Sequence, residues 1–179
     1  MALGALDSMG RGVLERSYRD IVAALDDRDR MLLVAEEDSQ IQGMAQLVFS
    51  GATNADHRAE VQRIGVSAAA RGRGIGRQLM AAVEEMGRES GITLLWLTTH
   101  EGTDARLFYE AIGYTKMGTM PNYSRRPDGT LWPHTGICET SNRNTRGRGH
   151  RLRRSVTSNV VVLTDGSPCR HLGSRDSRT

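Results

Sequence analysis

Six consecutive residues of this chain combine glycine and arginine in a way that suits phosphate binding: Arg71, Gly72, Arg73, Gly74, Ile75 and Gly76. Glycine has no Cβ, so the backbone can turn tightly and approach a ligand closely. A helix that begins at such a turn points free N–H groups and a positive dipole end at an anion. Together with the two arginines this predicts a diphosphate pocket, although the six residues alone also fit an ordinary turn between a strand and a helix.

The segments that flank this turn are those that such a pocket needs. Residues 59–66 largely alternate apolar and polar side chains, which predicts a strand. Gly65 near the end of that strand indicates a β-bulge or a close backbone approach. Residues 75–90 predict a helix whose apolar face consists of Ile75, Leu79, Ala82, Val83 and Met86. The turn therefore joins a strand to an amphipathic helix.

Hydrophobic periodicity along the rest of the chain predicts an α/β fold with a mixed sheet. The expected helices cover residues 13–25, 75–90 and 103–112, and the expected strands cover residues 31–35, 41–49, 59–66, 92–98, 114–117 and 131–139. Consecutive strands joined by short loops favour antiparallel pairs, whereas a strand–helix–strand unit favours a parallel pair. The sheet should therefore contain both kinds of pairing.

The positive charge of the chain is concentrated at its C-terminal end. The 179 residues carry a net charge of +3, but residues 141–179 hold nine arginines and only two acidic residues. We therefore expect one domain over residues 1–140 and an Arg-rich, disordered tail over residues 141–179, with a lone strand at 160–163. We do not expect nucleic-acid binding, because the basic tail lacks the aromatic side chains that stack on bases.

Several other classes of protein do not fit the composition. No apolar run approaches the roughly 20 residues that span a bilayer, and the first residues lack the pattern of a signal peptide. We therefore expect a cytoplasmic protein that does not contact membranes. Cys138 and Cys169 lie far apart, and the five histidines are scattered, so we expect neither a disulfide framework nor a metal site.

Two landmarks of the chain resemble those of the GNAT N-acetyltransferases. A strand ending at Val66 and followed by Arg71-x-x-Gly74-x-Gly76 and a helix resembles the acetyl-CoA signature of that family. The segment Phe108-Tyr109-Glu110-Ala111-Ile112-Gly113-Tyr114 resembles its second landmark, a helix with an aromatic pair that runs into Gly-Tyr. Over residues 58–138 the chain looks closest to the tabtoxin-resistance acetyltransferases.

The resemblance implies a GNAT-like sheet, splayed near its middle, that holds acetyl-CoA in a V-shaped opening. Backbone groups at Ile64, Gly65 and Val66 would contact the pantetheine arm of the coenzyme. The coenzyme's pyrophosphate would be wrapped by Arg71, Gly72, Arg73, Gly74, Ile75 and Gly76. This agrees with the diphosphate pocket inferred from the residues themselves.

Acetyl transfer to an amine needs a proton acceptor for the amine and benefits from a proton donor for the leaving thiolate. By resemblance, Glu60 is the candidate base; otherwise it is a surface glutamate on the polar face of a strand. Tyr109 is the candidate acid; otherwise it is an aromatic residue of the core. The resemblance favours a catalytic role for Tyr109 and leaves the two readings of Glu60 evenly balanced.

Two departures from the tabtoxin-resistance group affect this assignment. Thr98 stands where that group has an acidic residue on the strand after the cofactor helix. Glu101 and Asp104 are near in sequence but need not point the same way, and His100 is either a substitute for the acidic residue or a loop residue. In addition, the residues before position 13 are too few for the family's extra leading strand and longer helical segment, which help to form the acceptor pocket.

We therefore expect an acetyl-CoA-dependent N-acetyltransferase that acts on a primary amine of a small molecule, such as an antibiotic or a toxin. Two alternatives remain: an enzyme that acetylates proteins or peptides, and a CoA-binding module that has lost turnover. The sequence identifies neither the acceptor nor the oligomeric state, so a homodimer also remains open.

Overall fold

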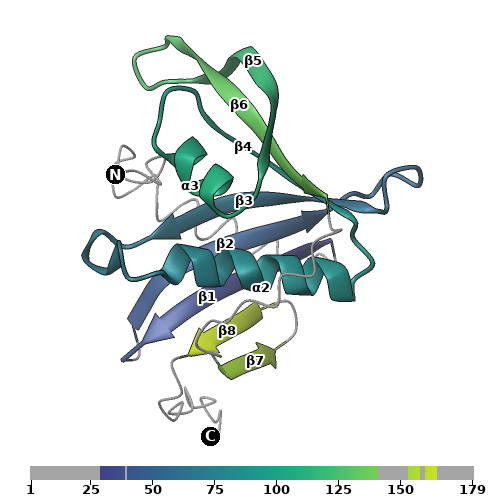
Figure 1. The fold of residues 1–179 in the computed structure, drawn as a ribbon, viewed down its shortest axis with the longest axis vertical. Helices are drawn as coiled ribbons and strands as arrows, with labels where there is room; N and C mark the ends of the chain where they lie inside the picture. The colour runs from purple at the N-terminus through teal and green to yellow at the C-terminus, as the bar shows by residue number, and fades with distance from the viewer. Residues whose placement is uncertain (1–28, 39, 141–152, 158–159, 165–179) are drawn as a thin grey trace, which may run out of the picture.

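One mixed sheet organises the part of the chain that the structure describes (Figure 1). The computed structural model describes residues 29–38, 40–140, 153–157 and 160–164, so the helix expected over residues 13–25 lies outside it. Within these ranges eight strands pair in the order β5-β6-β4-β3-β2-β1-β8-β7. They are β1 (Arg30–Glu37), β2 (Gln40–Phe49), β3 (Arg58–Val66), β4 (Leu94–His100), β5 (Thr115–Arg125), β6 (Leu131–Thr140), β7 (Arg153–Thr157) and β8 (Val160–Thr164). The predicted α/β fold with mixed pairing is confirmed.

Two helices cover one face of this sheet (Figure 1). Helix α2 (Ile75–Glu89) packs across β1, β2 and β3, and the shorter α3 (Ala105–Ala111) packs against β4, β5 and β6. The core between helices and sheet includes Leu33, Leu47, Leu79, Val83 and Ile137, which are all fully buried. A smaller cluster of Leu32, Val34 and Met44 lies on the opposite face.

Helix α2 forms where the apolar spacing predicts it, and a glycine lets it sit close to the sheet. A Cβ atom built on Gly43 of β2 would lie 3.0 Å from the Leu79 side chain and 3.0 Å from the Gly65 carbonyl oxygen. Because β2 carries no side chain there, the first turns of α2 approach the sheet directly. This places the start of α2 beside the end of β3.

A β-bulge in β3 redirects its side chains before the strand ends, as Gly65 led us to expect. Gln62 pairs with Gln46 of β2, and Gly65 pairs with Met44, so Ala45 faces two residues of β3. The first of these is Arg63, with a φ of 52°. Because a bulge shifts the alternation by one residue, Val66 packs under α2 while Glu60 points to the other face.

Two strands differ from the sequence-based expectation. β5 runs over Thr115–Arg125, whereas the sequence indicates only its beginning, at residues 114–117. It lies at one edge of the described sheet and almost all of its residues are exposed, so it lacks the apolar alternation that reveals a strand. β8 confirms the strand expected near residues 160–163, but it does not stand alone.

The expected disorder of residues 141–179 is wrong for the two segments of this region that the structure describes. β8 pairs in parallel with β1, with Leu32 opposite Val160, and β7 pairs antiparallel with β8. Val161 and Leu163 are buried in the main core. An apolar patch that the sequence presents as isolated is therefore part of the sheet, while the division of domains at residue 140 stays a prediction.

Candidate active site

The central strands β3 and β4 separate partway along their length (Figure 1). They pair in parallel only between Arg58–Glu60 and Leu94–Trp96. Beyond this point β3 stays paired with β2 as far as Val66, and β4 stays paired with β6 as far as His100. The result is a V-shaped opening with Glu60 and Trp96 at its apex, as the resemblance implied.

The predicted phosphate loop lies between β3 and α2. Gly72 and Gly74 have φ values of 77° and 85°, which favour glycine, and a Cβ on either would meet nothing within 4 Å. Gly74 is the residue before the first turn of α2, where it has no side chain to cap the free N–H groups. That first turn holds no acidic residue. Exposed glycines, uncapped N–H groups and a positive helix end together fit a diphosphate.

The two arginines of this loop occupy different surroundings. Arg73 forms an ion pair with Glu37 at the end of β1, with 2.8 Å between a guanidinium nitrogen and a carboxylate oxygen. Arg71 is half-buried. The ion pair therefore links the phosphate loop to the end of β1, and it places the Glu37 carboxylate next to a loop that is predicted to bind phosphate.

Glu60 lies on the sheet face that points away from α2. Its neighbours in β3, Ala59 and Val61, belong to the core under that helix, so the alternation of the strand turns Glu60 the other way. The carboxylate is half-buried, and the Gln62 side chain donates a hydrogen bond of 2.8 Å to it. Glu60 thus faces the apex of the opening from the side opposite α2.

Tyr109 lies on the other face of the sheet, under the helices. It belongs to the core under the helices, and its ring packs edge-on against Phe108, with 5.2 Å between the ring centroids. The Phe108 ring in turn lies 3.5 Å from the position of a Cβ built on Gly76, which links α3 to the start of α2. Burial raises the pKa of the Tyr109 hydroxyl well above its usual value, so it stays protonated at neutral pH. The two candidate catalytic residues therefore lie on opposite faces of the sheet.

Thr98 has an unexpected partner on the neighbouring strand. The hydroxyl of Thr98 lies 3.1 Å from Nδ1 of His134 in β6, and Nε2 of His134 lies 2.9 Å from the hydroxyl of Ser124 in β5. Nothing in the hydrophobic pattern singles out His134 or Ser124. Only the register, in which His100 pairs with His134, brings them to Thr98.

An aromatic stack surrounds this contact. The His100 ring lies parallel to the Trp132 ring, with 4.3 Å between centroids, and the Arg126 guanidinium lies 3.5 Å from the Trp132 centroid. His134 meets the edge of His100 with a centroid distance of 4.5 Å. Burial, together with the charge of Arg126, lowers the pKa of His100; burial, together with His100, lowers the pKa of His134.

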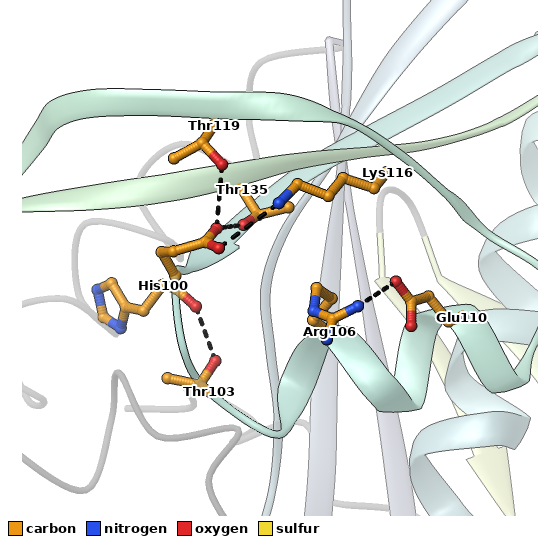
Figure 2. Close-up of polar contacts among 8 residues, drawn as sticks. His100, Thr103, Arg106, Glu110, Lys116, Thr119 and Thr135 are labelled. Carbon is orange, nitrogen blue, oxygen red and sulfur yellow. Dashed lines mark hydrogen bonds and ion pairs between the residues drawn. The ribbon is translucent and has the colours of Figure 1, made fainter.

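Glu101 does not replace the acidic residue that Thr98 lacks. Figure 2 shows Lys116, Thr119 and Thr135, which all contact the Glu101 carboxylate. Thr135 and His134 are neighbours in β6, so they point to opposite faces of the sheet. Glu101 is therefore held on the face that does not carry the Thr98 hydroxyl. Asp104 is exposed at the start of α3 and makes no capping hydrogen bond with its side chain.

A model of the acetyltransferase (GNAT) family matches residues 6–114 of the chain. The chain belongs to this family. It is an acetyltransferase, of a family whose acetyl donor is acetyl-CoA. Among the described residues of this GNAT domain, no group of histidine, cysteine and acidic side chains could hold a metal ion, and no helix is long and apolar enough to cross a bilayer.

Solved structures of other acetyltransferases have the same fold. A ribosomal-protein-alanine N-acetyltransferase from Brucella melitensis is 26% identical, with a TM-score of 0.61 over 71% of this chain and 78% of that one. A nourseothricin acetyltransferase is 27% identical, with a TM-score of 0.56 over 64% of this chain and 66% of that one. An acetyltransferase from Salmonella typhimurium, solved with its cofactor acetyl-CoA, is 18% identical, with a TM-score of 0.61 over 75% and 78% of the two chains. At 18% identity, the Salmonella structure shows only that the two proteins share a fold.

Proposed function

We propose that this GNAT acetyltransferase transfers the acetyl group of acetyl-CoA to a primary amine of a small molecule, by direct attack in a ternary complex. The separation of β3 and β4 immediately after the Glu60–Trp96 pair carries the proposal. It opens the sheet between a phosphate loop, a carboxylate and a buried tyrosine.

In this proposal the chain holds acetyl-CoA along β3 and the start of α2. The pyrophosphate binds at residues 71–76, where the N–H groups of α2 are uncapped and the glycines leave space. The pantetheine arm lies along the backbone of Ile64, Gly65 and Val66, on the edge of β3 that β4 leaves open. The coenzyme supplies an acetyl thioester, and the opening holds it beside the amine so that positioning provides much of the acceleration.

Glu60 and Tyr109 then act on the acceptor nitrogen and on the leaving thiolate. The Glu60 carboxylate attracts the ammonium group of the acceptor and takes one proton from it, which frees the nitrogen lone pair for attack. The nitrogen loses a second proton after the attack, as the amide forms. The Tyr109 hydroxyl, kept protonated by burial, donates a proton to the departing thiolate.

The similarity to a nourseothricin acetyltransferase, at 27% identity, supports a small-molecule acceptor and an antibiotic as one candidate. The resemblance of the sequence to the tabtoxin-resistance group also predicts a small-molecule acceptor. A second candidate is acetylation of a protein N-terminus, which the similarity to a ribosomal-protein-alanine N-acetyltransferase supports at 26% identity.

The experiment is an acetyl-transfer screen with two readouts, release of CoA thiol and product mass. The panel contains nourseothricin, other amine antibiotics, polyamines, and peptides with an N-terminal alanine. Transfer to a small amine in preference to the peptides supports the proposal, and transfer to the peptides alone overturns it. Calorimetric binding of acetyl-CoA without transfer to any acceptor would identify a CoA-binding module instead.

A further inference from the structure

A hydrogen-bonded chain of three side chains runs across β4, β6 and β5 on the sheet face that carries Glu60. Thr98 follows Trp96 by two residues in β4, and Trp96 pairs in parallel with Glu60. Residues two apart in a strand share a face, so Thr98 and Glu60 face the same side of the opening, one from each of the separating strands. His134 and Ser124 extend the chain away from Thr98.

A neutral imidazole in this chain has one nitrogen that donates and one that accepts. If Nε2 carries the hydrogen, it donates to the Ser124 hydroxyl, and Nδ1 accepts from the Thr98 hydroxyl. The two oxygen lone pairs of Thr98 then remain directed away from His134. In this arrangement Thr98 can accept a hydrogen bond from a ligand in the opening while it donates to His134.

Aromatic rings and titratable groups surround His134. His100 of β4 meets its edge, and the Tyr123 ring of β5 lies 4.5 Å from it between centroids. Arg126, in the turn between β5 and β6, stacks on Trp132 behind His100. The Glu101 carboxylate, next to His100 in the chain, accepts a hydrogen bond from Thr135 on the other face. Burial and His100 accordingly lower the pKa of His134.

We propose that Thr98 and His134 form a proton relay for the acceptor amine, which rests on the proposed function. After Glu60 has taken the first proton and the amine has attacked, an N–H bond of the protonated tetrahedral adduct breaks as an O–H bond forms on Thr98, and the original Thr98 O–H bond breaks as an N–H bond forms on Nδ1 of His134. The imidazolium so formed donates from Nε2 to Ser124, and the acceptor nitrogen keeps the electron pair of the broken bond as the amide forms. Thr98 contacts the amine, whereas His134 acts through Thr98 and is a positioning residue.

The relay supplies a proton acceptor on β4, the strand on which the tabtoxin-resistance acetyltransferases have an acidic residue. An imidazole changes its charge near neutral pH, where a carboxylate is already ionised and a weak proton acceptor. Glu60 takes the first proton of the acceptor nitrogen from β3, and the relay takes the second proton from β4. Thr98 is therefore a replacement for a carboxylate rather than the loss of one.

The first test measures the hydrogen-bond chain itself, without any acceptor. Long-range nitrogen–proton NMR spectra of imidazole-labelled protein give the tautomer of His134 and its titration. We expect the hydrogen on Nε2, and a changed His134 signal in Thr98→Val but not in Thr99→Val, a matched control on the same strand that points to the other face. A hydrogen on Nδ1 at neutral pH would overturn the relay.

The second test measures acetyl transfer against pH with an amine found in the screen. His134→Asn should lower kcat by about 10²-fold, leave the KM for acetyl-CoA unchanged and remove the acidic limb of the kcat profile that His134 produces. Thr98→Val should have the same effect, Thr98→Ser should retain the wild-type profile, and the double variant should be no slower than either single one. His57→Asn, an exposed histidine, is the control.

The outcomes separate the two proposals. Wild-type transfer with an unchanged pH profile in His134→Asn overturns the relay and leaves the proposed function in place. A wild type that transfers acetyl to no amine overturns the function and the relay with it. Melting temperatures and the Thr98→Ser variant distinguish a lost relay from a lost fold.

Discussion

Glu60 lies directly opposite Trp96 in the last pair of residues that β3 and β4 share before they separate. This pair therefore fixes where the sheet opens, and it puts a carboxylate at the closed end of the opening. A group bound between the two strands meets Glu60 on one side only, the face away from α2.

Replacing Glu60 by Gln should lower kcat for acetyl transfer by about 10²-fold, because the amide keeps the shape of the side chain but neither attracts an ammonium group nor accepts its proton. The Kd for acetyl-CoA should stay unchanged. Steady-state kinetics and calorimetry measure the two quantities. Glu85→Gln, an exposed glutamate of α2, is the control, and equal kcat values for both variants would exclude Glu60 as the base.

Replacing Tyr109 by Phe should also lower kcat by about 10²-fold, since the thiolate loses its proton donor. Burial raises the pKa of Tyr109 far above its usual value of about 10, so the hydroxyl stays protonated, and the wild-type rate should show no loss from Tyr109 ionisation up to pH 9 or so. Tyr114→Phe is the matched control, because that ring lies in the same cluster at 6.0 Å from Tyr109. A slower Tyr114→Phe with normal Tyr109→Phe would reverse the assignment.

Replacing Glu37 by Gln should strengthen acetyl-CoA binding. The carboxylate competes with the phosphates for Arg73 and repels them, and an ion pair as exposed as this one contributes up to about 1 kcal/mol. We expect a Kd lower by up to about fivefold, measured by calorimetry at low salt. Glu36→Gln, the preceding residue in β1, should leave the Kd unchanged. Weaker binding in Glu37→Gln would mean that the ion pair holds the loop in its binding conformation.

Replacing Gln46 by Met should stabilise the fold. Gln46 is fully buried in β2, and neither polar atom of its amide has a hydrogen-bond partner among the residues that the structure describes. An unsatisfied buried polar group costs about 1–3 kcal/mol, and methionine has a similar length without that cost. Urea unfolding should show that the free energy of unfolding rises by about 1 kcal/mol. Gln40→Met, at an exposed position, is the control and should leave the free energy of unfolding unchanged. A loss of stability would mean that the amide has a partner.

Ending the chain after Thr140 should destabilise the domain, whereas ending it after Thr164 should not. The shorter form lacks Val161 and Leu163, which are buried, and burying each such side chain contributes about 1.5–3 kcal/mol. It also exposes the edge of β1, which favours aggregation. Urea unfolding of the two forms measures the difference. Equal stabilities would show that β8 contributes nothing to the fold.

The sequence predicts those parts of the site that local patterns determine. Helix α2 and the turn before it follow from apolar spacing and from glycines, and these act over a few residues. The bulge near Gly65 follows from one glycine in an alternating strand. Each of these features depends on neighbours along the chain, which is why the phosphate loop could be located without a structure.

The contact between Thr98 and His134 could not be predicted in the same way. It depends on the register of β4 against β6, which long-range packing sets, and a shift of one residue would turn His134 to the other face. Likewise, the apolar residues near Val161 indicate a strand but carry no information about its partner. The sequence therefore gives the elements of the candidate site more readily than the contacts between strands.

The parallel pairing of Leu32 with Val160 affects how this protein is made. β1 leaves the ribosome early. Its outer edge is covered by β8, which is synthesised after all the other described strands. During that interval the nascent chain carries an open, apolar β-edge that can pair with another copy. Slow translation or a premature stop would prolong this exposed state, so the yield of soluble protein should depend on how quickly its last strands are synthesised.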